Sequence, residues 1–216
     1  MKPDIAANTT IIEELLLSTK REGMDKLIEH MKEHGFFTSP GSTRFHGCYK
    51  GGLAVHSIGV YEMLVSFAGL LRLECPADSL IIAPLLHDLC KMGAYIGEEK
   101  PYTYNRSQPK GHAVLSITRI SRFIKLTDLE DKMIRYHMGV YGLVEFDGQK
   151  GEYPLRGGGL ANAWHHHPVV KVMYFCDELA TLEEKADEEP PCLGCVKINT
   201  EECNDGCPHS QKPSGL

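Results

Sequence analysis

The amino-acid sequence predicts an all-α fold, and three observations support that prediction. Apolar residues recur three and four positions apart along most of the chain, which is the spacing of amphipathic helices. Capping residues, glycine and proline stand where such helices would begin and end. With 216 residues, of which 42% are hydrophobic and 24% charged, the chain has the length and composition of one soluble globular domain with a small appendage.

The first half of the chain contains three expected helical segments. Residues 8–35 begin with an Asn/Thr capping cluster and end at a glycine, and Gly23 is expected to divide them into two helices. Residues 53–73 form a long, mostly apolar helix. Residues 76–93 form the next helix, with Pro76 suited to its first turn and a glycine to its end.

The second half contains three more helical segments. Residues 112–126 and 128–138 meet at a Thr-Asp pair, either member of which can cap the second helix. Residues 160–187 are helical again, and Pro168 either breaks this segment or starts a new helix. Two polar connections, 94–111 and 138–159, are long for an all-helical domain, which indicates a functional role. The first of them has the composition of a short hairpin.

Charge and hydropathy exclude several classes of partner. The net charge is −6 and the sequence has no basic stripe, so a surface for duplex nucleic acid is not expected, although a single nucleotide is compatible with this charge. No apolar run approaches the roughly 20 residues of a membrane span. The first residues lack the features of a signal peptide. A cytoplasmic protein with reduced thiols is therefore expected.

Ionisable residues stand on the apolar helices or at their ends. The clearest case is His87 next to Asp88 within the otherwise apolar stretch LLHDLCK. A buried carboxylate needs a partner, and a cation would supply one. The candidate ligands, almost all from different helices, are His56, His87, Asp88, His112, His137 and Asp177. Taken singly, a histidine such as His56 is more often a core or surface residue than a ligand.

Several helices that each supply one inward ligand can build a metal site in a bundle. The nitrogen and oxygen donors of this set suit Fe, Mn, Zn, Co or Ni, with Mg less favoured. The sequence therefore predicts one or two divalent transition-metal ions.

The segments GGLAVHS, LLHDLCK and FCDELAT, in this order, resemble the HD-domain superfamily of metal-dependent phosphohydrolases. Its hallmark is a His, a His-Asp doublet and a distant Asp on a helical scaffold, and the resemblance covers residues 44–185. KGHAVLSI and IRYHMG resemble the subset with two extra histidines and two metals, in particular the HD domain of YhaM-type exoribonucleases. Met138 stands where a paired histidine is common in that group, and no nucleic-acid-binding barrel precedes the domain; both count against a polynucleotide substrate.

The resemblance implies a role for each candidate ligand. His56, His87, Asp88 and Asp177 would hold the first metal, and Asp88 would bridge to a second metal held by the remaining two histidines. A water shared by the metals would attack phosphorus. Lys91, one turn after Asp88, would stabilise the charge that develops, or simply pair with that carboxylate. The catalytic residues expected are thus Asp88 and Lys91.

Loop residues are candidates for substrate binding. His46 is expected to bind substrate or support a ligand, with an ordinary surface position equally compatible. Arg44, Lys50 and Arg106 are cations that could grip phosphate. Three consecutive histidines, 165–167, point in different directions on a helix and are read as a surface cluster.

The last residues form a Cys-rich tail, so that residues 1–187 are expected as the helical domain and 188–216 as an appendage. Cys192, Cys195, Cys203 and Cys207 have a spacing that suits a structural zinc site. Replacement of one thiolate by His209, an iron–sulfur cluster and a redox-sensitive tail without metal remain open.

The sequence as a whole predicts a phosphohydrolase acting on a small phosphomonoester or phosphodiester, such as a nucleotide or short oligonucleotide. Two alternatives remain open. One is a di-iron oxygenase of HD type, and the other is a metal-stabilised binding module without catalysis. The oligomeric state is not predicted.

Overall fold

A computed structural model describes residues 3–43, 47–98, 101–109, 111–139 and 159–186 of the chain. The elements are α1 (Ile5–Ser18), α2 (Met24–Glu33), the 3-10 turn η1 (Phe36–Thr38), α3 (Gly52–Leu70), α4 (Ala77–Leu86), the 3-10 turn η2 (Leu89–Lys91), β1 (Tyr95–Ile96), β2 (Thr103–Tyr104), α5 (His112–Ile120), α6 (Asp128–Arg135), α8 (Gly159–His166) and α9 (Pro168–Ala186). Apart from the antiparallel β1–β2 hairpin, this part of the chain is helical, which confirms the all-α prediction.

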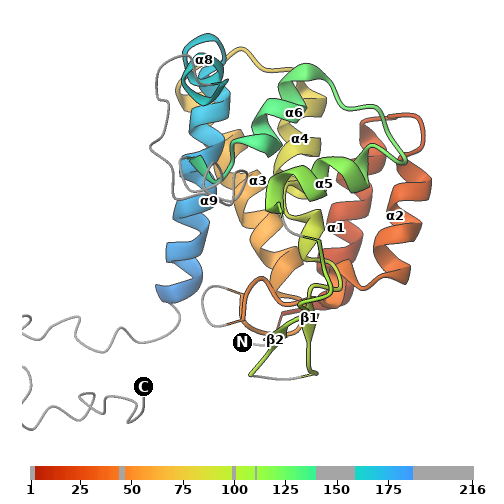
Figure 1. Cartoon of the computed structure of the whole chain (residues 1–216). Coiled ribbons are helices and arrows are strands. Elements are labelled where there is room, and N and C mark those ends of the chain that lie inside the picture. Colours follow the sequence, from red (N-terminus) through yellow and green to blue (C-terminus); the bar gives the residue numbers. More distant parts are fainter. Residues whose placement is uncertain (1–2, 44–46, 99–100, 110, 140–158, 187–216) are drawn as a thin grey trace, which may run out of the picture.

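Helix α3 is the centre of the bundle. It packs against α9 on one side and against α4 and α1 on the other, as Figure 1 shows. Leu53, Val60 and Leu64 on α3 are completely buried in the core. With 19 residues and a mean hydropathy of 1.5, α3 is long and apolar enough to span a membrane by length and composition alone, contrary to the expectation that no apolar run approaches that length. Core helices share this property.

Several helix boundaries follow from local chemistry. Gly23 adopts φ 84°, which L-residues with a side chain avoid, and it separates α1 from α2 as predicted. Thr127 forms the capping box of α6 with Glu130, and Pro168 begins a new helix. The expected start at residue 8 was wrong, because the side chain of Asp4 accepts a hydrogen bond from the Ala7 N–H and caps α1 earlier.

Two predicted helices were too long. Helix α4 ends at Leu86 instead of residue 93, since the Cys90 N–H is donated to the Ser116 hydroxyl, 3.0 Å away, rather than to the helix. Helix α5 ends at Ile120 instead of residue 126. After Ile120 the chain forms a tighter turn, in which the Phe123 N–H donates to the Ile120 carbonyl oxygen. A contact with a distant segment thus accompanies the end of α4, whereas a local turn ends α5.

The start of α3 provides a test of the packing. A Cβ on Gly52 would lie 2.0 Å from the Gly47 carbonyl oxygen, whereas a Cβ on Gly69 would meet nothing within 4 Å. We expect Gly52→Ala to lower the free energy of unfolding by at least about 2 kcal/mol, because backbone would have to move. Gly69→Ala, the matched control, should raise it by up to about 1 kcal/mol. Urea unfolding measures both, and a Gly52→Ala protein as stable as the wild type would contradict the packing.

Candidate metal centre

Six ionisable side chains converge where the helices of the bundle meet. His56 lies on α3, His87 directly after α4, Asp88 directly before η2, His112 at the first residue of α5, His137 two residues after α6, and Asp177 on α9. The packing of α3 against α4 and α9, and of α6 against α9, brings these positions together. Of the six, only His112 and Asp177 retain appreciable exposure, with 19% and 15% of the side chain accessible.

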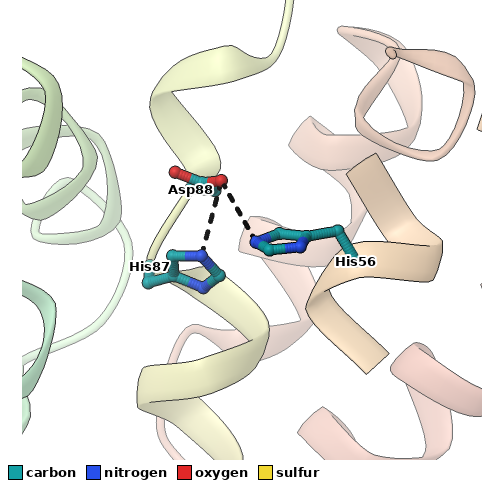
Figure 2. A group of neighbouring side chains, drawn as sticks. All are labelled: His56, His87 and Asp88. Carbon is teal, nitrogen blue, oxygen red and sulfur yellow. Dashed lines mark ion pairs between the residues drawn. The ribbon is translucent and has the colours of Figure 1, made fainter. Parts of the chain in front are cut away.

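The first half of the cluster is built around His56 and His87. The Nε2 atom of His56 lies 2.9 Å from Asp177 Oδ1 and 3.8 Å from Asp88 Oδ2. The Nε2 atom of His87 lies 3.4 Å from each of the same two oxygens. Figure 2 shows both imidazole rings turned toward one oxygen of Asp88. Two nitrogens and two oxygens thus surround one small volume.

The second half of the cluster uses the other oxygen of Asp88. Oδ1 lies 2.6 Å from His112 Nε2 and 3.7 Å from His137 Nε2. Asp88 therefore presents one oxygen to each pair of histidines. A carboxylate in this position can bridge two cations.

The donor set fits a divalent metal. His87 Nε2 and Asp88 Oδ1 are buried without a hydrogen-bond partner among the described residues, although other site atoms lie close to both. His112 Nε2 lies 2.6 Å from Asp88 Oδ1, and two carboxylate oxygens lie 3.4 Å from His87 Nε2, so several ligand atoms share one space, as expected around a cation. Leaving such groups unpaired costs free energy, which a bound ion would offset. Imidazole nitrogens and carboxylate oxygens suit Fe, Mn, Zn, Co or Ni.

Backbone carbonyls orient two of the rings. His87 donates its Nδ1–H to the Pro84 carbonyl oxygen at 2.8 Å, and His137 donates its Nδ1–H to the Ile134 carbonyl oxygen at 2.6 Å. A carbonyl only accepts hydrogen bonds, so both rings carry their proton on Nδ1. Each Nε2 is thereby turned toward the cluster, the arrangement that a metal-binding histidine needs.

The electrostatics keep the carboxyl groups ionised. Burial alone would raise the pKa of Asp88, but the charges of Lys91 and His87 hold it well below its ordinary value. Burial also opposes ionisation of Asp177, yet the neighbouring imidazoles of His56 and His87 lower its pKa. Burial would lower the pKa of His87, whereas the Asp88 charge raises it to about 10, so a cation that binds at Nε2 would displace a proton from this ring. Burial and the His87 charge lower the pKa of His137 to about 3, which leaves that ring neutral.

Lys91 supplies a positive charge beside the cluster. Its Nζ lies 2.6 Å from Asp88 Oδ2, and 14% of the side chain is exposed. Burial would lower the pKa of Lys91, but the negative charge of Asp88 raises it, so the ammonium stays protonated. The 3-10 turn η2 places Lys91 three residues after Asp88, on the same side of the chain.

Some of the other predicted residues lie on the surface, and some lie outside the described part of the chain. Lys50 and Arg106 are exposed on connecting segments, and their role in binding phosphate stays a prediction. Arg44, His46 and the four tail cysteines lie outside the described residues, and so does the boundary at residue 187. His165 and His166 are exposed at the end of α8, which agrees with the expected surface cluster.

Three supporting residues were missed by the sequence analysis. Cys90 lies with its Sγ 2.9 Å from His112 Nδ1, and Ser116 and Arg119 on α5 bind the backbone of η2. Of the three, only Cys90 could have been noticed in the sequence, because it follows the His-Asp doublet by two positions. The other two are ordinary polar residues on an amphipathic helix, and nothing local marks them.

A helical bundle that gathers four imidazoles and two carboxylates in its interior has the ligand set of a divalent-metal site. Residues 53–197, about two thirds of the chain, match the family model described as HD domain, and the chain belongs to the HD-domain family. No curated protein and no solved structure shows a significant match to the chain. The HD family consists typically of metal-dependent phosphohydrolases.

Proposed function

We propose that the protein is a metal-dependent phosphohydrolase that cleaves a small phosphomonoester or phosphodiester, a nucleotide or short oligonucleotide being the best candidate. The observation that carries this proposal is the position of Asp88, whose two oxygens face two different pairs of histidines. This arrangement suits a two-ion centre for phosphoester hydrolysis. The net charge of −6 favours a small substrate over duplex nucleic acid.

In this proposal the ligands divide into two sets. His56, His87 and Asp177 would hold one ion, and His112 and His137 would hold the other, with Asp88 available to both. Bound divalent ions lower the pKa of water and neutralise charge on phosphoryl oxygens. The neutral state of His137 and the ionised state of both aspartates are the forms that ligate a cation.

Lys91 has a separate role in the proposed reaction. Its ammonium lies beside Asp88 and is partly exposed, so it can donate to an oxygen of a bound phosphoryl group. The cations Arg44, Lys50 and Arg106, together with His46, are proposed to bind more distant parts of the substrate.

Metal-dependent hydrolysis is the direct test. After exhaustive chelation we expect no hydrolysis of bis(p-nitrophenyl) phosphate or p-nitrophenyl phosphate above the buffer rate. Addition of Mn, Fe or Co should restore activity, and Mg should restore less, because nitrogen donors favour transition metals. A panel of nucleotides then identifies the substrate class. The control is the same metal solution with an Asp88→Asn protein.

Two results would contradict the proposal. Hydrolysis that never exceeds the buffer rate, with any of these metals and substrates, would favour a binding module. A mixed-valent di-iron centre that consumes dioxygen in the presence of an organic substrate would favour an oxygenase.

A further inference from the structure

The second metal position contains a histidine that is held differently from its neighbours. His87 and His137 donate Nδ1–H to backbone carbonyl oxygens. On His112 the corresponding nitrogen faces a side chain, with Nδ1 2.9 Å from the Sγ of Cys90. The opposite nitrogen of the same ring, Nε2, lies 2.6 Å from Asp88 Oδ1.

The chemistry of the imidazole determines which atom donates the hydrogen bond between His112 and Cys90. A neutral imidazole carries one proton, and the nitrogen that ligates a cation must be the unprotonated one. If Nε2 of His112 ligates, its Nδ1 carries the proton and donates it to the sulfur of Cys90. The two ring nitrogens point in different directions, so an ion at Nε2 lies on the side of the ring away from this sulfur.

Cys90 is itself held in place by α5. Its N–H donates to the Ser116 hydroxyl at 3.0 Å, and its carbonyl oxygen accepts from Arg119 Nη1 at 3.0 Å. The same guanidinium donates to the carbonyl oxygens of Leu89 and Met92, at 3.3 and 3.0 Å. Only 5% of Cys90 is exposed. The backbone of Cys90 is therefore fixed relative to the helix that begins at His112, which limits where its sulfur can lie.

We propose that Cys90 is a positioning residue for the second metal ion, because its sulfur accepts the Nδ1–H of His112 and keeps Nε2 available as the ligand. This inference rests on the two-ion arrangement proposed above. A supporting hydrogen bond of this kind typically changes metal affinity by about 10- to 100-fold. The effect falls on one ion, since His56, His87 and Asp177 belong to the other set.

Metal titration of four proteins tests the inference without any assay of activity. They are the protein with its native Cys90, called wild type below, and Cys90→Ala, Cys90→Ser and Cys75→Ala, whose thiol lies before α4 and serves as the matched control. All four carry serine in place of Cys192, Cys195, Cys203 and Cys207, so that the tail contributes no bound ion. After chelation, each is titrated with Co²⁺ and its bound metal is counted. We expect two ions in the wild type and in Cys75→Ala. In Cys90→Ala the weaker ion should bind about 10- to 100-fold less tightly, while the other binds as in the wild type. Cys90→Ser keeps an acceptor and should fall between them.

A second measurement reads the protonation of the His112 ring directly, and its NMR part does not depend on whether the variants fold. In the Zn²⁺-loaded protein, NMR of the imidazole nitrogens of His112 should show the proton on Nδ1. With the four tail cysteines replaced by serine, the Co²⁺-loaded protein should lack a sulfur-to-cobalt charge-transfer band. A proton on Nε2, or such a band removed by Cys90→Ala, would overturn the inference, the latter because the sulfur would then ligate the ion itself.

The titration also separates this inference from the proposed function. Two ions bound equally well by the wild type and by Cys90→Ala would overturn the role of Cys90 and leave the hydrolase proposal intact. A wild type that binds no ion, or only one, would overturn the inference, and absence of any ion would overturn the proposed function as well.

Discussion

Asp88→Asn should lower the rate of phosphoester hydrolysis by at least about 1,000-fold, the scale expected when a principal charge-stabilising group is lost from an active site. The carboxylate is buried and offers one oxygen to His56 and His87 and the other to His112 and His137. Asparagine keeps the shape of the side chain but offers a single neutral oxygen. Both metal positions should therefore weaken together, and the metal content should fall.

Lys91→Gln is the informative comparison for this prediction. Lys91 touches Asp88 but is not in either set of proposed ligands. We expect its substitution to lower turnover while the protein keeps its metal, whereas Asp88→Asn loses both. Metal analysis and steady-state kinetics on the two variants measure the difference, with thermal unfolding to verify that each is folded. An Asp88→Asn protein that hydrolyses phosphoesters at the wild-type rate would exclude this centre as the site of chemistry.

The largest effect on stability is expected at Glu130, a completely buried carboxylate that is not one of the candidate metal ligands. Its Oε1 accepts hydrogen bonds from Arg21 Nη2 at 2.8 Å and from the Ser79 hydroxyl at 3.1 Å. Its Oε2 accepts from Arg21 Nη1 at 3.0 Å and from the Thr127 N–H at 2.8 Å. One side chain thus joins α6, α4 and the connection between α1 and α2.

We expect Glu130→Ala to lower the free energy of unfolding by about 3 to 5 kcal/mol, because it leaves the Arg21 charge without its main partner. Arg21 is 19% exposed, so water can relieve part of the loss and the lower end of this range is favoured. Asp131→Ala is the matched control on the same helix. Its ion pair with Arg135 is about one-third exposed on each side, and its loss should cost less than about 1 kcal/mol. Similar unfolding energies for the two variants would contradict the role given to Glu130.

The Arg21–Glu130 ion pair predicts that the free energy of unfolding depends on pH. Burial would raise the pKa of Glu130, but the hydrogen bond from Arg21 and those from Thr127 and Ser79 lower it below the ordinary value of 4.5. A carboxyl group with a lowered pKa contributes stability above its unfolded pKa and loses it as the pH falls through the folded value. The difference in unfolding energy between the wild type and Glu130→Gln should therefore be constant above about pH 5 and shrink below pH 4.5. A difference that does not change with pH would contradict this sign.

Much of the centre was predictable because burial of ionisable groups leaves a mark in the sequence. The His87–Asp88 doublet and Asp177 interrupt apolar stretches, and a carboxylate in such a place needs a cation. His56, His112 and His137 could be recognised as candidate ligands only from their order around that doublet. Cys90 and Arg119 could not be assigned in this way, since a buried thiol and a helical arginine are ordinary residues whose roles depend on what they touch.

The sequence by itself determined the helical class, the division at Gly23, the new helix at Pro168 and the identity of the candidate ligands. These properties are local, because helix periodicity, caps and breakers act over a few residues. Tertiary structure alone decided that α4 ends before the doublet, that Asp88 divides its oxygens between two pairs of rings, and that Arg21 reaches Glu130. Each of these depends on partners from segments distant in the chain, and only packing brings such partners together.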